Sequence, residues 1–126
     1  MRTLITGGTV VNATGPIPMD VLVDGETIAA LYAPGTGPSD VDTIDASGKY
    51  VIPGGIDVHT HMEMPFGGTF SSDTFETGTT AAAWGGVTTI VDFVVQRTGE
   101  VVQEALAQWH TKAGGHCAID YGFHMI

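Results

Sequence analysis

The stretch GGIDVHTHMEMPFGG, residues 54–68, marks the point at which the sequence pattern of the chain changes. It begins with a short apolar run that contains one acidic residue, Asp57, and then carries two histidines, His59 and His61, one residue apart. On a β-strand, residues i and i+2 point to the same face. The spacing therefore predicts two imidazoles side by side at the end of a strand over residues 55–61.

Downstream of Pro53, predicted helices alternate with predicted strands. SDTFETGTTAAAWGG, residues 72–86, predicts a helix with Asp73 as N-cap, Glu76 completing a capping box, and Gly85 and Gly86 at its end. VTTIVDFVV, residues 87–95, is nearly all apolar or β-branched, which is typical of a strand covered on both faces. GEVVQEALAQWHTKAGG, residues 99–115, predicts a second helix whose apolar face and glycine stop are formed by Val102, Leu106, Trp109, Gly114 and Gly115.

The last run, CAIDYGFHMI, residues 117–126, predicts a third strand. The order β-α-β-α-β indicates the α/β class and begins either an open doubly wound sheet or a (β/α)₈ barrel. The final strand runs to the last residue with no polar tail or crossover helix after it. Because a complete barrel takes about 250 residues, we expect the chain to be the amino-terminal part of a longer protein.

Upstream, residues 1–52 predict a small β module with mixed strand pairing. Runs rich in Val, Ile, Leu and Thr alternate with Gly-Gly, Asp-Gly and Ser-Gly turn signals. LVDGETIAAL predicts a hairpin with its tight turn at Asp24 and Gly25, and residues 33–40 (APGTGPSD) predict an exposed loop. We therefore expect two domains, residues 1–52 and residues 53–126.

Composition excludes several classes of function. The chain has 14 Asp and Glu against 4 Lys and Arg, a net charge of −10, which repels nucleic acid and anionic membranes. Its single cysteine cannot form an internal disulfide. No apolar run could span a bilayer, and the first residues lack a signal-peptide pattern. We expect a cytoplasmic protein that acts on a small molecule.

The histidine pair is the strongest candidate for chemistry. It lies at the carboxyl end of a predicted strand, where parallel sheets and barrels carry their active sites. Neutral imidazole suits ions such as Zn, Ni, Fe or Mn. An isolated His-x-His pair can also be structural, and two ligands leave a zinc site incomplete. The surrounding strand, Gly-rich loop and helix favour metal ligation by His59 and His61.

The other reactive side chains have structural interpretations. We expect His110 and His116 at the surface or a helix end, and His124 in the core or at the rim of the sheet. Cys117 is expected to be a small core residue rather than a nucleophile. Two strand carboxylates, Asp57 and Asp92, need partners if they are buried, and each could orient a ligand or cap a helix. Ser71 and Ser72 have no visible base, so the sequence does not favour a serine hydrolase.

Residues 51–93 resemble the first barrel strand, loop and helix of the cyclic amidohydrolases, in particular the dihydropyrimidinases or D-hydantoinases. DVHTH alone, residues 57–61, indicates only the wider amidohydrolase superfamily. MPFGGT (residues 64–69) and DYGFHM (residues 120–125) indicate the narrower group. The resemblance continues through residues 44–57 and 104–126, so it covers nearly the whole chain.

The resemblance implies a (β/α)₈ barrel preceded by a β-sandwich domain, of which residues 1–52 would form part. His59 and His61 would bind one ion of a centre of two divalent metals, most often Zn²⁺, bridged by a carboxylated lysine outside these residues. The remaining ligands and the catalytic aspartate would also lie outside them. Residues 62–72 would form a substrate-gating loop, with Met64 and Phe66 in the substrate pocket. The full-length protein would be a homotetramer.

The implied activity is hydrolysis of dihydropyrimidines or 5-substituted hydantoins to N-carbamoyl amino acids. Allantoinase and dihydroorotase share the superfamily motif and are alternatives within the same class of enzyme. A non-catalytic scaffold protein with the same fold is a further alternative. Residues 1–126 alone are expected to be inactive, because they would expose unpaired strand edges.

Overall fold

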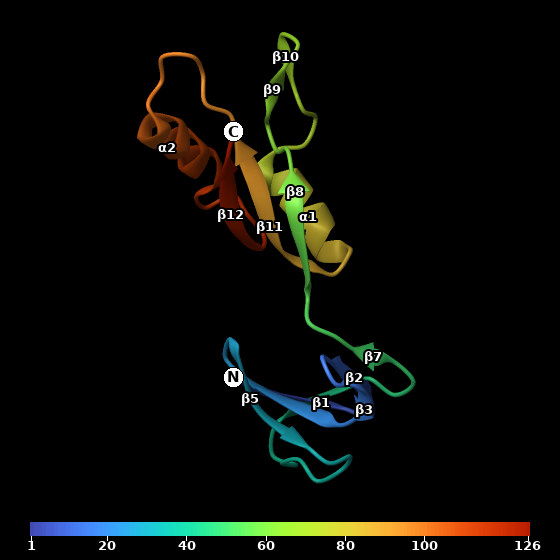
Figure 1. Cartoon of the computed structure of the whole chain (residues 1–126). Helices are drawn as coiled ribbons and strands as arrows, with labels where there is room; N and C mark the ends of the chain where they lie inside the picture. The colour runs from blue at the N-terminus through green and yellow to red at the C-terminus, as the bar shows by residue number, and fades with distance from the viewer. The chain divides into compact units, whose positions relative to one another are not determined.

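The computed structural model describes residues 1–126 and divides them into two compact units, Met1–Pro53 and Gly54–Ile126 (Figure 1). The first unit contains strands only, whereas the second combines strands with two helices. Neither helix has the length and apolar character that crossing a membrane would require.

The first unit contains two small sheets. Their strands are β1 (Arg2–Thr6), β2 (Thr9–Asn12), β3 (Gly15–Pro18), β4 (Asp20–Asp24), β5 (Thr27–Tyr32), β6 (Asp42–Asp45) and β7 (Tyr50–Val51). One sheet has the order β5-β4-β1-β6 and the other β3-β2-β7. In each sheet one strand pairs antiparallel on one side and parallel on the other. The predicted mixed pairing is therefore confirmed.

The predicted hairpin is formed by β4 and β5, but its turn lies one residue later than expected. Asp24 pairs with Thr27, so Gly25 and Glu26 form the turn. Gly25 has a φ of 59°, a left-handed conformation that glycine adopts at little cost. Next to this hairpin, the buried carboxylate of Asp20 accepts hydrogen bonds from the backbone N–H groups of Gly7 and Gly35.

The second unit has a three-stranded parallel sheet, and a helix connects each strand to the next along the chain. Its main elements are β8 (Gly55–Thr60), α1 (Phe75–Trp84), β11 (Val87–Val94), α2 (Val102–Ala113) and β12 (Asp120–Met125). The sheet order is β12-β11-β8, and both pairings are parallel. The predicted β-α-β-α-β order is therefore confirmed (Figure 1).

Both helices contribute to one core on the same side of this sheet. The core cluster consists of Phe75, Ile90, Val94, Ala105, Trp109 and Ala113. Along β11, Ile90, Asp92 and Val94 are fully buried, whereas the alternate residues Val91 and Phe93 are half-buried. Within the second unit the two helices cover one face of this strand, and the half-buried residues lie on the other face, which the sequence predicted to be covered as well.

The helix ends differ in detail from the sequence prediction. The N-cap of α1 is Thr74, not Asp73: the Thr74 hydroxyl accepts a hydrogen bond from Thr77 N, and the Thr77 hydroxyl accepts one from Thr74 N. Thr77 therefore takes the place that the prediction gave to Glu76. Gly85 and Gly114 cap the two helices, as expected.

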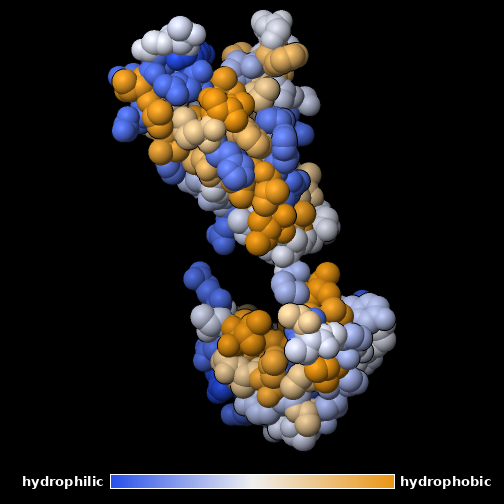
Figure 2. Space-filling view, in the orientation of Figure 1, coloured by the Kyte–Doolittle hydropathy of each residue, from blue (hydrophilic) through white to orange (hydrophobic).

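The buried face of α2 begins three residues later than predicted, at Ala105 and not at Val102. Ala105, Trp109 and Ala113 are buried, and Leu106 packs against the core cluster. Val102, which the spacing placed on this face, is exposed because it is the first residue of the helix. Figure 2 shows that hydrophobic side chains also reach the surface of this unit, where exposed residues include Ile56, Val58 and Trp84.

Replacing Phe75 by Ala should destabilise the second unit strongly. The Phe75 ring is fully buried in the core cluster, and truncating such a ring costs about 3–5 kcal/mol. Urea denaturation followed by circular dichroism would measure the loss. Phe70→Ala is the matched control: this ring is 65% exposed, so the free energy of unfolding should change by no more than about 0.5 kcal/mol. Equal effects of the two substitutions would contradict the packing.

Candidate metal centre

A β-bulge in β8 includes the first histidine of the pair, His59. Ile90 of β11 pairs with Asp57 of β8, and Asp92 pairs with Thr60, so the interval on β8 contains one residue more than the interval on β11. Such bulges redirect side chains at the ends of strands. The His59 N–H donates to the Asp57 carboxylate at 3.1 Å. The carboxylate thus satisfies a backbone N–H group within the bulge. Asp57 thus stabilises the backbone that presents His59.

The two histidine rings converge through their Nε2 atoms, which lie 3.2 Å apart. Both residues are exposed, and their ring planes are nearly perpendicular at 86°. A separation of this size suits two nitrogens that bind one metal ion at about 2.0–2.1 Å each. With no ion between them, one ring would have to donate its Nε2 proton to the other. The pair therefore fits two positions of a metal site.

The ring of Phe93, on β11, packs against both histidine rings and also contacts a third imidazole. Its ring centroid lies 4.6 Å from that of His59, 5.3 Å from that of His61 and 5.1 Å from that of His124. His124 is exposed on β12 directly across from Phe93 in the sheet register. No three His, Cys, Asp or Glu side chains of residues 1–126 converge to hold an ion. The second unit thus brings two imidazoles together over one aromatic ring, that of Phe93.

Asp92 lies on the opposite face of β11 and is fully buried. Burial raises the pKa of its carboxyl group, while hydrogen bonds from Met62 N, Thr60 Oγ1 and Trp109 Nε1 act in the opposite direction. These are the partners that the sequence required of a buried strand carboxylate. Their identity could not be predicted, because Trp109 comes from α2 and the other two come from the end of β8.

The segment after His61, expected as a Gly-rich loop over residues 62–72, contains a short hairpin. Its strands are β9 (Pro65–Phe66) and β10 (Thr69–Phe70), joined by Gly67 and Gly68 with φ values of 59° and 83°. Gly-Gly between two aromatic residues is a hairpin signal, and it could have revealed this element. Phe66 is 76% exposed on the hairpin, and Met64 is half-buried at its base.

The base of the hairpin is bonded to the histidine pair. The Ser71 hydroxyl donates to the backbone carbonyl of His61 at 2.6 Å and accepts from Met64 N at 2.9 Å. Glu63 has a φ of 50°, and its N–H donates to the carbonyl of Asp73. Ser71, for which the sequence gave no reactive partner, is therefore a structural residue that links the hairpin to His61.

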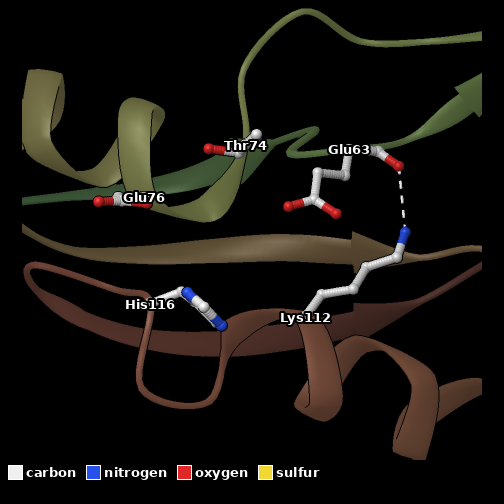
Figure 3. A pocket seen from close by; sticks show the side chains of 5 residues that line it. All are labelled: Glu63, Thr74, Glu76, Lys112 and His116. Atoms are coloured by element: carbon white, nitrogen blue, oxygen red, sulfur yellow. Dashed lines mark hydrogen bonds between the residues drawn. The ribbon is translucent and has the colours of Figure 1, made fainter.

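A separate cavity of about 270 Å³ is lined by Glu63, Thr74, Glu76, Lys112 and His116 (Figure 3). Lys112 Nζ donates to the carbonyl of Glu63 at 3.2 Å, and lies 4.4 Å from the centre of the Trp109 ring. His59 and His61 do not line this cavity. His110 and His116 are exposed, as the sequence predicted, and neither is brought to the histidine pair.

Cys117 packs against the core cluster and is half-buried. Burial raises the pKa of its thiol, and the negative charge of Asp92 adds to this effect. A raised thiol pKa reduces the fraction of reactive thiolate at neutral pH. The interpretation of Cys117 as a packing residue is consistent with this environment.

Comparison with known proteins identifies relatives along the whole chain. Residues 50–121 match the model of a family described as the amidohydrolase family. The chain is 62% identical over 129 residues to a D-hydantoinase of Streptomyces coelicolor, covering 99% of this chain and 28% of that protein. It is 42% identical over 128 residues to a dihydropyrimidinase of Rattus norvegicus, covering 98% of this chain and 25% of that protein.

Solved structures give the same result for the backbone. A dihydropyrimidinase from Brevibacillus agri superposes with a TM-score of 0.94 at 52% identity, over 99% of this chain and 27% of that one. A D-hydantoinase superposes with the same TM-score of 0.94 at 46% identity, again covering 27% of that chain. The chain thus spans roughly a quarter of the length of these relatives.

Replacing Ser71 by Ala should loosen the hairpin without unfolding the unit. The substitution removes two hydrogen bonds, which together are worth on the order of 1 kcal/mol. We expect backbone amides of residues 62–72 to exchange roughly fivefold faster, as measured by hydrogen exchange and mass spectrometry. Ser72→Ala, at an exposed position, is the control and should leave exchange unchanged. Unaltered exchange in Ser71→Ala would show that Ser71 does not hold the loop.

Cys117 should react slowly with a thiol-specific disulfide reagent at pH 7. Its raised pKa and partial burial should make the native rate at least about tenfold lower than the rate in urea. The native rate should still rise with pH where the rate of an ordinary exposed thiol has already levelled off, because the Cys117 pKa is raised. Absorbance of the released thiol would follow the reaction. Equal rates in buffer and in urea would contradict this environment.

Proposed function

Since the chain belongs to the amidohydrolase family, we propose that the whole protein is a hydrolase that opens the cyclic amide bond of dihydropyrimidines or 5-substituted hydantoins to give N-carbamoyl amino acids. The observation that carries this proposal is the 3.2 Å convergence of His59 Nε2 and His61 Nε2 at the carboxyl end of a parallel strand. The names of the relatives, D-hydantoinase and dihydropyrimidinase, support the substrate class.

The proposed cofactor is a pair of divalent metal ions, with Zn²⁺ as the first choice. The amidohydrolase family is metal-dependent. His59 and His61 would hold one ion through neutral imidazoles, and a carboxylated lysine beyond residues 1–126 would bridge the two. When bound, such ions polarise an amide carbonyl and make hydroxide available near neutral pH. The two histidines orient the ion and do not themselves transfer a proton.

The fold supports this assignment. The sheet order β12-β11-β8 follows the chain order of three parallel strands, as in the first third of a (β/α)₈ barrel. The histidine pair lies at the carboxyl end of the first of these strands, which is the end where barrel enzymes carry their active sites. We assign residues 53–126 to the barrel and residues 1–52 to part of a β-sandwich domain.

The hairpin of β9 and β10 provides the proposed contacts to substrate. Ser71 bonds it to His61, so its position is coupled to that of the metal ligand. Phe66 presents an exposed ring, and Met64 is half-buried at the base of the hairpin, where its N–H donates to the Ser71 hydroxyl. Both would contact the exocyclic substituent of the substrate ring. This arrangement suits a small, uncharged cyclic ureide or imide.

For the whole protein we further propose a cytoplasmic location and a homotetrameric assembly. The net charge of −10 disfavours binding to nucleic acid or to an anionic membrane. Size-exclusion chromatography with light scattering would test the oligomeric state.

Replacing His59 or His61 by Ala in the full-length protein should remove the ion that the pair holds and abolish hydrolysis. We expect metal content, measured by atomic emission, to fall from about two ions per chain to about one or fewer, and hydrolysis of dihydrouracil and a 5-substituted hydantoin to fall at least about 100-fold. His116→Ala is the matched control, because it removes an exposed imidazole that lies outside the pair.

Three results would overturn all or part of the proposal. Metal-free parent protein with no hydrolysis would favour a scaffold protein of the same fold. Metal content that stays at the parent level in both variants would assign the ligands elsewhere. Activity on allantoin or dihydroorotate, with none on hydantoins or dihydropyrimidines, would retain the metal site and change the substrate.

A further inference from the structure

Asp92 is a buried carboxylate that the proposed hydrolysis does not use directly. It is fully buried between Ile90 and Val94 on the helix-facing side of β11. No basic side chain forms an ion pair with it, since the one ion pair of residues 1–126 joins Arg2 and Asp24. Burying a carboxylate without a basic partner costs stability that an apolar residue at the same position would not. Its hydrogen bonds indicate what it does there.

The two bonds to one oxygen of Asp92 come from the neighbours of His61 on either side. Asp92 Oδ2 accepts from Thr60 Oγ1 at 2.9 Å and from Met62 N at 2.8 Å. A single oxygen thus joins the residue before His61 to the residue after it. Because His61 itself makes neither bond, its imidazole remains free to point toward His59.

These bonds occur where the strand ladder has ended. The last pair between β8 and β11 is Thr60 with Asp92, so His61 lies beyond regular strand pairing. Beyond this last pair, the Asp92 carboxylate takes over from the strand hydrogen bonds, because it accepts the backbone N–H of Met62. The bond from Ser71 to the His61 carbonyl holds the same peptide segment from the hairpin side.

The other oxygen of Asp92 is hydrogen-bonded to a side chain of α2. Trp109 Nε1, from a ring that is 4% exposed, donates to Asp92 Oδ1 at 3.1 Å. Lys112 lies over the Trp109 ring and donates to the carbonyl of Glu63, two residues after His61 (Figure 3). The backbone on both sides of His61 is thus attached to the core cluster through one helix.

We propose that Asp92 is a positioning residue for the metal centre: by holding Thr60 and Met62, it fixes the orientation in which His61 Nε2 meets His59 Nε2. This inference rests on the proposed function, because it takes His61 to be a metal ligand. It assigns no proton transfer and no metal contact to Asp92. Phe93, the next residue, supports the imidazoles on the other face of the same strand.

The test measures binding of Co²⁺ by the full-length protein, through the dissociation constant and the visible absorption spectrum of the bound ion. Asp92→Asn and Asp92→Ala should weaken Co²⁺ binding roughly tenfold, as residues that orient metal ligands do, and should alter the spectrum. Asp20→Asn is the matched control. It changes another buried carboxylate that accepts two backbone N–H groups, and it should leave Co²⁺ affinity unchanged whatever it does to stability.

A second substitution distinguishes positioning from general destabilisation. An amide at position 92 has one acceptor oxygen and one NH₂ group, so in Asp92→Asn the NH₂ must face either Trp109 or the Thr60 and Met62 donors. Adding Trp109→Phe removes the indole donor and lets the NH₂ take that side. The double variant should therefore bind Co²⁺ more tightly than Asp92→Asn alone, although it loses core packing and is less stable. A double variant that binds more weakly would contradict positioning.

The remaining outcomes are also decisive. If Asp92→Ala fails to fold, Thr60→Val removes one of the two bonds to Oδ2 while keeping the side-chain shape, and Co²⁺ affinity equal to that of the parent would overturn the inference. Parent-like affinity and spectrum in a folded Asp92→Ala variant would do the same, while leaving the proposed hydrolase intact. Failure of the parent to bind Co²⁺, or parent-like binding by His61→Ala, would overturn both.

Discussion

The alternation of side chains along β11 is the constraint on which the second unit depends. Ile90, Asp92 and Val94 face the helices, so Val91 and Phe93 must face the other way. Ile90 and Val94 build the core with Phe75 and Trp109, and Phe93 contacts the imidazoles of His59 and His61. The strand therefore carries the core on one face and the histidine contacts on the other, and a shift of one residue in its pairing would exchange the two.

Much of this arrangement follows from local sequence. The strands and helices of the second unit were predictable because β-branched runs, helical spacing and Gly-Gly stops act over a few residues. The convergence of His59 and His61 was predicted from their spacing on a regular strand, but in the structure His59 lies in a β-bulge and His61 lies beyond the end of β8, which the spacing does not show. Helix caps were predictable only to within a residue, because Asp73 and Thr74 are both good caps and the choice depends on the hydroxyl of Thr77.

Other features depend on contacts between segments far apart in the chain. The partners of Asp92 include Thr60 and Trp109, which are 32 and 17 residues away, and no local pattern relates them. The exposure of one face of the sheet is likewise a property of three dimensions, because an apolar strand sequence does not state what covers each side. The hairpin after His61 was missed for a different reason: its strands have two residues each, too few for a periodic signal.

The hairpin of β9 and β10 is attached to the rest of the unit through its base. Ser71 and Glu63 make the connecting bonds, whereas Gly67 and Gly68 at the tip have open space around them. Insertions or exchanges at the tip therefore leave the backbone of the two histidines untouched. In evolutionary terms the hairpin is a module: residues at its tip can be exchanged while the residues that hold the histidines stay the same.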